Sequence, residues 1–299
     1  MKKSINVGII IVNYNGAELT IECINSLIRS TFDEFKIYIV DNGSRREDVQ
    51  RLSEYCFNNS KTTLIDTRFN NGIAEGNNIG IRKAISENCN YIMLLNNDTV
   101  IDENMLKILV EKCEEGYKLC TPLMFYYDNP KRIWCAGGKF NKMMGTTKHL
   151  NANQNIDSTN LYEKEVEFVP TCCLLIEANL FRDNLFDPLY FLYYDDTDFL
   201  YKLNKKGYKI LFVPSAKLWH KVSSSSGGDE SPLSIYYLNR NRLYFINKNY
   251  TGIQKLFALV YTYVTRLIRM FDKNKGKIIY TALKDYHLSK LGYKEFKNN

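Results

Sequence analysis

The sequence lacks three patterns that would place it in a secreted, zinc-binding or membrane-spanning class. Its eight cysteines include no Cys-x-x-Cys pair, which argues against a disulfide or zinc framework and favours reduced, buried thiols. The apolar run over residues 256–264 is followed by Arg266 and Arg269, well short of the roughly 20 residues that span a bilayer. Residues 1–4 lead directly into an apolar segment without a signal-peptide cleavage region. We therefore expect a cytoplasmic protein.

Two common nucleotide-binding fingerprints are also missing. The sequence has neither a P-loop nor a Gly-x-Gly-x-x-Gly motif, so the usual ATP and dinucleotide interpretations have no motif behind them. Disorder is excluded by composition, because 45% of the residues are hydrophobic and can fill a sizeable core. The chain of 299 residues is long enough for one large domain and a helical tail.

Positive charge is concentrated at the C-terminal end. From Tyr236 onward the chain has 13 Lys or Arg and three Asp or Glu, a net charge of +10. The whole chain carries +7, so residues 1–235 sum to −3. A basic tail over residues 236–299 predicts contact with an anionic surface, such as the inner face of the cell membrane. Its apolar run is compatible both with packing on the body and with lying on a membrane. We find no nucleic-acid-binding motif in it and expect no nucleic-acid partner.

Strands and helices alternate through the first part of the chain. Short apolar segments predict strands at residues 5–12, 36–40, 62–65 and 91–95, and those at 5–12 and 91–95 are predicted to be buried. Amphipathic segments predict helices at residues 17–29, 48–57 and 77–86. This alternation predicts parallel βαβ units, and therefore an α/β domain with a mostly parallel sheet over residues 1–235.

The pattern loosens after residue 121. Residues 126–158 are predicted to form an irregular excursion with few strong strands. The predicted elements that follow are a strand at 167–176, a helix at 195–206, a strand at 209–213 that Pro214 ends, and helices from residue 235. Residues 223–231, rich in Ser and Gly, are predicted to close over a bound substrate.

Polar side chains follow each of the first four predicted strands. They are Asn13 and Asn15, then Asp41, then Asn71, Gly76 and Asn77 within residues 70–80, and finally Asn96, Asn97 and Asp98. Each group could be an ordinary turn, because Asn, Asp and Gly form turns for local reasons. Ligands of open α/β sheets bind at the carboxyl ends of the strands, so four groups in succession indicate a binding site there.

Two further positions are candidates for chemistry. Asp98 ends a buried strand beside two amides, which suits a divalent cation that carries a diphosphate, although it could also cap the following turn. Asp195, Asp196 and Asp198 begin a predicted helix behind three aromatic residues. They could simply cap that helix, or the aromatic surroundings and crowded acids could raise one carboxyl pKa towards that of a general base.

In this order the motifs resemble the family 2 glycosyltransferases, and most closely the rhamnosyltransferase-type branch that builds bacterial surface polysaccharides. The resemblance covers residues 5 to about 245. It rests on residues 11–15, 40–44, 70–80, 95–99, 194–198, His220 and 236–242. It implies the GT-A fold, which is a Rossmann-like nucleotide-sugar-binding α/β domain, and a cofactor of Mg²⁺ or Mn²⁺.

The resemblance also assigns roles to individual residues. Asp41 would contact the base or ribose of the donor. Asp98 would hold the metal on the diphosphate and His220 would complete the metal or phosphate site, while Arg240 and Arg242 could assist the leaving diphosphate. The family's catalytic base falls on Asp196. The acid before it is Asp195 rather than the usual Glu, so Asp195 is the alternative base.

The implied activity is an inverting transfer of a hexosyl or rhamnosyl unit. Its donor would be a dTDP-, UDP- or GDP-linked sugar, and its acceptor a hydroxyl of a glycan or of a lipid-linked saccharide. With Asn at 96 and 97, Asp98 is the only carboxylate of the metal motif, which implies a weakly held metal. The alternative is a catalytically inactive nucleotide-sugar-binding or scaffold protein on the same fold. The presence of Asp98, Asp196 and His220 argues against that alternative.

Overall fold

The computed structural model describes residues 5–222 and 230–296. The predicted loop over residues 223–231 therefore lies almost entirely outside the described residues. The predicted elements of the first part are all present: β1 (Val7–Asn13), α1 (Ala17–Ile28), β2 (Phe35–Asp41), α2 (Arg46–Phe57), β3 (Thr62–Asp66), α3 (Gly72–Ser86) and β4 (Tyr91–Leu95). Strands β4, β1, β2 and β3 pair side by side and in parallel, as predicted.

Helix α3 begins at Gly72, earlier than the predicted residue 77. Two asparagine side chains account for this earlier start. Asn70 Oδ1 accepts the Gly72 N–H at 3.0 Å, and Asn42 Oδ1 accepts the Asn71 N–H at 3.0 Å. Free amide groups at the first turn of a helix need such acceptors, so the polar loop after β3 continues directly into the helix.

The second part of the body adds strands to one side of β4. Its elements are β5 (Thr99–Ile101), α4 (Met105–Glu114), β6 (Leu119–Tyr126), β7 (Ile133–Cys135), β8 (Gly138–Asn141), β9 (Thr146–His149), β10 (Lys164–Val166), β11 (Cys173–Glu177), α5 (Asp195–Lys205) and β12 (Ile210–His220), with 3₁₀ turns η1 (Ile156–Ser158), η2 (Ala178–Phe181) and η3 (Pro188–Tyr190). Within the described residues the main sheet has the order β10-β12-β6-β11-β4-β1-β2-β3. Strand β11 is antiparallel to both of its neighbours.

Three predictions for this part need correction. Pro214 does not end its strand, because β12 continues to His220 past an irregularity between Val213 and Lys217. Proline cannot donate to a ladder and is tolerated where the ladder is interrupted. Of the strand predicted at 167–176, only residues 173–176 form a strand, as part of β11, while β10 ends before that range at Val166. The stretch predicted as irregular contains three short strands, of which β8 and β9 form a hairpin.

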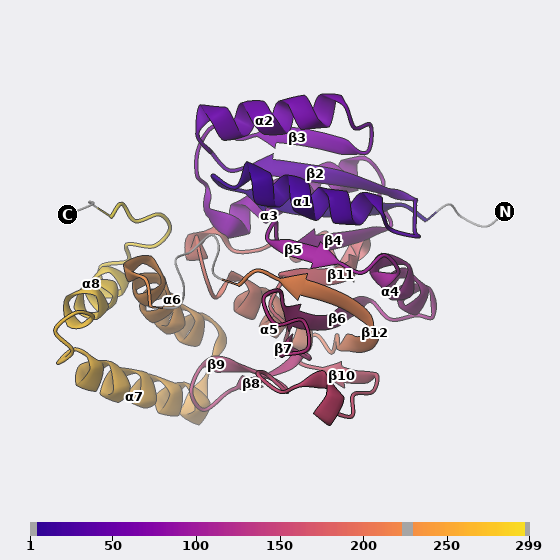
Figure 1. Ribbon diagram of the computed structural model, residues 1–299. Coiled ribbons are helices and arrows are strands. Elements are labelled where there is room, and N and C mark those ends of the chain that lie inside the picture. Colours follow the sequence, from indigo (N-terminus) through magenta and orange to yellow (C-terminus); the bar gives the residue numbers. More distant parts are fainter. Residues whose placement is uncertain (1–4, 223–229, 297–299) are drawn as a thin grey trace.

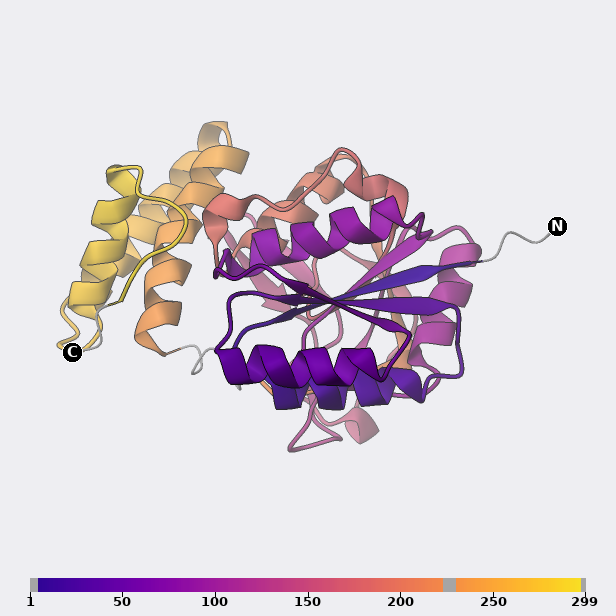
Figure 2. The ribbon, with the colours of Figure 1, turned by 90° about the horizontal axis from the view of Figure 1, so that it is seen from above.

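Helices cover both faces of the sheet. Helices α1 and α2 lie on one face and α3 lies on the other (Figure 2). Helix α3 packs very closely on β1, since a Cβ added at Gly80 would stand 2.4 Å from Ile10 Cγ2. The centre of the main core is formed by the apolar side chains of β1, β2, β4 and β6, which are almost completely buried, as expected for strands covered on both faces.

The tail consists of three helices, α6 (Pro232–Asn249), α7 (Gly252–Arg269) and α8 (Gly276–His287). They lie at the end of the body where the parallel strands β1 and β2 terminate (Figures 1 and 2). Phe245, Ile246, Tyr250 and Ala258 of the tail belong to the main core cluster. Since the tail shares this core with the body, the domain boundary predicted between residues 235 and 236 stays a prediction. In the described part of the chain, no helix is long and apolar enough to cross a membrane.

Candidate active site

Asn13 is the centre of a polar cluster at the ends of β1, β2 and β4. Its Nδ2 donates to Asp41 Oδ1 at 2.8 Å, and its Oδ1 accepts from Thr20 Oγ1 at 2.8 Å. Asn97 Nδ2 donates to the same Thr20 hydroxyl at 3.1 Å, and the Ser44 N–H donates to Asp41 Oδ2 at 3.0 Å. Asp41 is fully buried, and both of its oxygens accept bonds. The cluster joins the ends of the three strands into one rigid edge.

Asn15 and Asn71 lie on the outer side of this cluster. Asn15 has a backbone φ of 51°, and its side-chain Oδ1 accepts a hydrogen bond from the Arg45 N–H at 2.9 Å. Asn71 is half-buried and donates to the Phe69 carbonyl at 2.9 Å. Both side chains shape the loops after β1 and β3, and both are partly open to solvent, where a donor nucleoside is expected.

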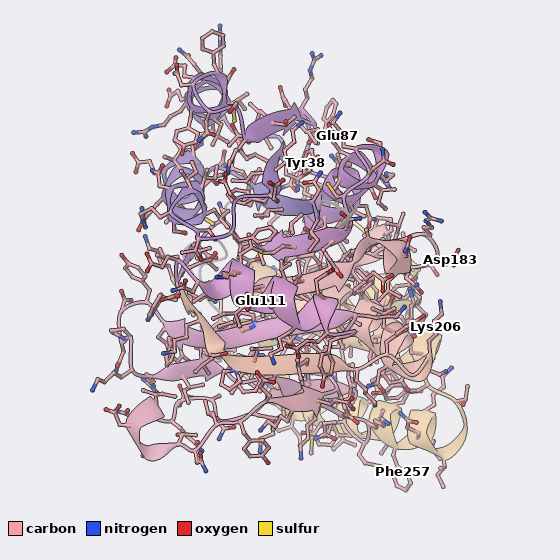
Figure 3. All side chains as sticks on the ribbon, turned by 90° about the vertical axis from the view of Figure 1, so that its right-hand side faces the viewer. Tyr38, Glu87, Glu111, Asp183, Lys206 and Phe257 are labelled. Atoms are coloured by element: carbon pink, nitrogen blue, oxygen red, sulfur yellow. The ribbon has the colours of Figure 1, made fainter. Side chains whose placement is uncertain are left out.

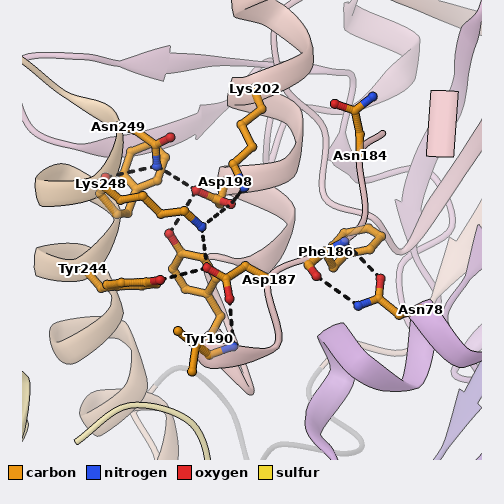
Figure 4. Close-up of polar contacts among 12 residues, drawn as sticks. Asn78, Asn184, Phe186, Asp187, Tyr190, Asp198, Lys202, Tyr244, Lys248 and Asn249 are labelled. Atoms are coloured by element: carbon orange, nitrogen blue, oxygen red, sulfur yellow. Dashed lines mark hydrogen bonds and ion pairs between the residues drawn. The ribbon is translucent and has the colours of Figure 1, made fainter. Parts of the chain in front are cut away.

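Gly76 and Asn77 lie within helix α3 rather than in the loop before it. A Cβ at Gly76 would stand 2.9 Å from Val12 Cγ1, so this glycine allows α3 to approach β1. Asn77 is buried in the same helix. The next residue, Asn78, exchanges two hydrogen bonds with the Phe186 backbone at 2.9 and 3.0 Å (Figure 4). The structure thus gives Gly76 a packing role, and its predicted donor contact stays a prediction.

Asp98 and His220 form a buried pair. Strands β5 and β12 pair antiparallel with Thr99 opposite His220, which brings His220 Nε2 to 3.0 Å from Asp98 Oδ1. The indole ring of Trp134 stands edge-on to the His220 ring, with centroids 4.4 Å apart. His220 Nδ1 is buried and has no hydrogen-bond partner within the described residues. Such an orphaned ring nitrogen is expected of a group that meets a ligand.

This pair fits a divalent cation that a substrate helps to hold. No cluster of three or more His, Cys, Asp or Glu side chains that could hold a metal occurs within residues 5–222 and 230–296. Mg²⁺ in phosphate-transfer sites is bound by one or two protein ligands, with the remaining positions filled by phosphate oxygens and water. Asp98 and His220 supply an oxygen and a nitrogen ligand. The half-buried Asn96 next to them donates its backbone N–H to the Cys172 carbonyl at 2.9 Å.

Asp195 and Asp196 differ in their environments at the start of α5. Burial, together with the neighbouring charge of Asp196, raises the pKa of Asp195 well above its usual range. Burial also raises the pKa of Asp196, to about 6. Asp196 is partly exposed and its Oδ1 accepts from the Thr197 N–H at 2.5 Å and the Thr197 hydroxyl at 3.0 Å. Asp196 is therefore the accessible carboxyl with a pKa suited to a general base.

Asp198 has a structural role instead. Its fully buried carboxylate contacts Lys202 Nζ at 2.5 Å and Lys248 Nζ at 3.0 Å, and it accepts from Asn249 Nδ2 at 2.7 Å (Figure 4). These cations balance its charge. Burial is the leading cause of the raised pKa of Asp196, and the charge of Asp198 contributes to the raised pKa of Asp195.

The turn before Asp195 has an unusual backbone. Phe191, Tyr193 and Tyr194 all have φ between 61° and 67°, a region that non-glycine residues rarely occupy. Asn241 of α6 supports this turn, since its Nδ2 donates to the carbonyls of Leu192 at 2.8 Å and Tyr193 at 3.0 Å. The tail therefore helps to position the candidate base.

Arg240 and Arg242 are engaged by carbonyl groups of the protein itself. The fully buried Arg240 donates to the carbonyls of Gly292 at 2.7 Å and Tyr190 at 3.2 Å. Arg242 donates from Nε to the Met144 carbonyl at 3.0 Å. Their predicted role beside the leaving diphosphate stays a prediction. We interpret both as residues that anchor the tail to the body.

Cys172 lies near both Asp98 and Asp196. Burial raises the pKa of its thiol well above the usual value, and the nearby charges of Asp98 and Asp196 add to that increase. A thiol held protonated is a poor nucleophile, so Cys172 is a landmark between the carboxylates rather than a reactive group. The sequence alone gave no signal for Thr20 or Trp134, because neither belongs to a motif at a strand end.

Comparison with known proteins identifies the family. A profile described as Glycosyl transferase family 2 matches residues 8–182, more than half of the chain. The chain belongs to glycosyl transferase family 2. The matched region of this family 2 member includes Asp41 and Asp98, and it ends before Asp196 and His220.

Its relatives include glycosyltransferases of similar length. The low-salt glycan biosynthesis hexosyltransferase Agl10 of Haloferax volcanii is 24% identical over 289 residues, 93% of this chain and 89% of Agl10. The dTDP-rhamnosyl transferase RfbF of Shigella flexneri is 25% identical over 294 residues, 90% of each chain. The glycosyltransferase GlyG of Streptococcus pneumoniae is 23% identical over 109 residues, 36% of this chain, which spans only 35% of GlyG.

Solved structures confirm the fold. GalNAc-T7 with UDP, GalNAc and Mn²⁺ superposes with a TM-score of 0.61 at 18% identity, covering 80% of this chain and 48% of that one. The mannosyltransferase PcManGT of Pyrobaculum calidifontis, with GDP-Man and Mn²⁺, gives 0.58 at 11% identity, covering 96% and 76%. The predicted GT-A architecture, a mostly parallel sheet flanked by helices with C-terminal helices after it, is confirmed.

Proposed function

We propose that this family 2 member is an inverting glycosyltransferase that moves a hexosyl or rhamnosyl unit from a nucleotide-diphosphate donor to a hydroxyl group. The proposal rests on one relationship above all. Asp98 and Asp196 come from separate parts of the chain, and both lie close enough to the buried Cys172 thiol for their charges to raise its pKa. One carboxylate is paired with a buried histidine, and the other is a base with a pKa of about 6.

Asp196 would take the proton of the acceptor. An alcohol is a poor nucleophile near neutral pH, so a carboxylate must accept its proton as the oxygen attacks the anomeric carbon. Asp196 is ionised above pH 6 and partly exposed, whereas burial raises the pKa of Asp195 well above its usual range. This difference favours Asp196 over the alternative. Attack from the side opposite the diphosphate would invert the anomeric centre and needs no covalent intermediate.

Asp98 and His220 would hold the diphosphate end of the donor. A divalent cation, when bound there, would neutralise charge on the leaving nucleoside diphosphate. The orphaned His220 Nδ1 and the Asp98 carboxylate would fix that end of the donor, while the Asn13 cluster fixes the loops around the nucleoside. Asn15, Asn71 and Asn96 would complete the donor contacts.

The names of relatives and of solved neighbours indicate several possible nucleotide-sugar donors. RfbF is named for dTDP-rhamnosyl transfer and Agl10 for hexosyl transfer, and the solved neighbours contain UDP or GDP-Man. We extend this to a dTDP-, UDP- or GDP-linked donor with Mg²⁺ or Mn²⁺. The acceptor would be a glycan or lipid-linked saccharide in bacterial surface polysaccharide synthesis.

A thermal-shift panel tests the donor. The protein is heated with dTDP, UDP and GDP, each with and without Mn²⁺. We expect one nucleotide to raise the melting temperature, and to do so more strongly with the metal, because a ligand that binds only the folded state stabilises it. Mass spectrometry with sugars of that nucleotide then identifies the transferred unit. The same curve for every nucleotide, with and without Mn²⁺, would contradict the proposal.

A further inference from the structure

Helix α7 exposes a long apolar face. The side chains of Ile253, Leu256, Phe257, Val260, Val264 and Leu267 are each between 49% and 72% exposed. Their spacing of one, three or four residues places them on one side of the helix. Phe257 points away from the body at its outer edge (Figure 3). We call these six side chains the α7 face.

The opposite side of α7 contacts the body. Ala258 and Thr262 are the buried residues of this helix, and Ala258 belongs to the main core cluster. Arg266 is also on this inner side, where burial lowers the pKa of its guanidinium to about 10. A helix that only packs on a body turns its large apolar residues inward. Leu259 and Tyr263 of α7 pack inward against the core clusters, but the six side chains of the α7 face point outward, so packing on the body does not explain that face.

Exposed cations stand at one end of the α7 face. Arg269, Lys273 and Lys277 are exposed, and Phe271 between them is 89% exposed. Helix α7 itself contains no Asp or Glu. The tail carries +10 while residues 1–235 carry −3, so a negatively charged surface attracts the tail and repels the body.

We propose that the α7 face docks on an anionic membrane surface, with its apolar side chains in the headgroup region and the neighbouring cations near lipid phosphates. An amphipathic helix with aromatic and aliphatic residues beside basic ones binds such surfaces in this way. A second copy of the chain is a poorer occupant, because two tails that each carry a net charge of +10 repel each other.

Membrane docking adds a location to the proposed glycosyltransferase function. The biological role of docking rests on that function, but the docking itself does not. Helix α6, which precedes α7, supports the turn that leads to Asp195 and Asp196. A protein attached through α7 would therefore keep the candidate base near the membrane, where a lipid-linked acceptor lies. Vesicle binding itself needs no donor and no turnover, so the two proposals can fail separately.

Flotation with vesicles tests the α7 face. Wild-type protein is mixed with vesicles of phosphatidylcholine alone, or with about one third phosphatidylglycerol. We expect flotation with the anionic vesicles only, and a bound fraction that falls about tenfold in the double variant Phe257→Asp, Val264→Asp. The matched control is Phe57→Asp together with Phe69→Asp, which adds the same charge at exposed aromatic residues of the body. We expect this control to float like wild type.

A charge variant tests the electrostatic part independently. Lys273→Glu with Lys277→Glu should reduce flotation about tenfold at low salt, while Lys107→Glu with Lys139→Glu, exposed lysines of the body, should have a small effect. Circular dichroism confirms that each variant is folded. Flotation that ignores lipid charge would overturn the proposal. So would light scattering that shows a dimer which Phe257→Asp dissociates, since the α7 face would then bind a second copy. If the protein turns over its donor in solution but does not float with anionic vesicles, the docking proposal is wrong and the proposed activity stands.

Discussion

The side-chain amide of Asn241 donates to the carbonyl oxygen of Tyr193 at 3.0 Å. The same amide also donates to the carbonyls of Tyr190 and Leu192, each at 2.8 Å, and its oxygen accepts from Arg240 Nε at 2.9 Å. Tyr193 has φ of 62°, a costly conformation that persists only where the surroundings hold it. One asparagine of the tail therefore fixes the turn that leads to the candidate base.

Removing this amide should impair catalysis more than binding. In Asn241→Ala the carbonyls of the turn lose their donor, so the position of Asp196 becomes less well defined. We expect kcat to fall by about tenfold or more with a smaller change in the donor KM, and the free energy of unfolding to fall by about 1–3 kcal/mol. Steady-state kinetics and urea unfolding measure the two effects.

Asn247→Ala is the matched control for that variant. Asn247 lies in the same helix and donates to the Leu243 carbonyl at 3.0 Å, away from the turn. We expect nearly wild-type kcat in this variant. Equal losses of kcat in both variants would show that Asn241 acts through general stability of α6 and not through the turn.

The Asp98–His220 pair should determine metal-assisted binding of the nucleotide. Asp98→Asn keeps the shape of the side chain and removes its charge, and His220→Phe removes the orphaned nitrogen. Because both groups are placed to hold the diphosphate end, each variant should lose about 10- to 100-fold in affinity for the nucleoside diphosphate with Mn²⁺. Isothermal titration measures this. Wild-type affinity in both variants, with and without Mn²⁺, would remove the pair from the site.

Activity should depend on the ionisation of Asp196. Its pKa is about 6, and only the ionised form accepts a proton. The rate should therefore fall as the pH falls below about 6, by roughly tenfold per pH unit, and level off above it. A pH profile of kcat/KM checks this expectation. A profile that stays flat down to pH 4 would exclude Asp196 as the base.

The same carboxyl should make the fold less stable at high pH. Its pKa is higher in the folded chain than the ordinary value of 3.8, so its contribution to stability is fully present at low pH. That contribution is lost as the pH rises from about 4 to about 6. Asp196→Asn should therefore melt above wild type at pH 8, and the difference should shrink at pH 4. A variant that is less stable than wild type at pH 8 would contradict this.

Much of the fold is readable from local patterns. Strands β1, β2 and β4 contain continuous apolar runs, and such runs predict strands that are covered on both faces. Pro214 was misleading, because the interruption of β12 that accommodates it depends on pairing with β6 and not on the local sequence. The start of α3 was missed for a similar reason, since the Asn42 side chain that supports it comes from the loop after β2.

The sequence motifs predicted which residues belong to the candidate site, but not which of their side chains contact one another. Asp98, Asp196 and His220 stand in recognisable segments, yet only the pairing of β5 with β12 brings His220 to Asp98. Arg240 and Arg242 follow a family motif, and charge alone suggested a phosphate contact. Their burial against backbone carbonyls depends on how the tail packs, which no local pattern encodes.

Transfer by wild type and by Asp196→Asn tests the central claim most directly. Mass spectrometry follows release of nucleoside diphosphate from the donor that the thermal-shift panel selects, with Mn²⁺ and an acceptor saccharide at pH 8. The account predicts turnover by wild type, a loss of roughly 10²- to 10⁴-fold in Asp196→Asn with donor affinity unchanged, and a smaller loss in Asp195→Asn. Full activity in Asp196→Asn, with activity abolished in Asp195→Asn, would contradict the assignment of Asp196 as the base.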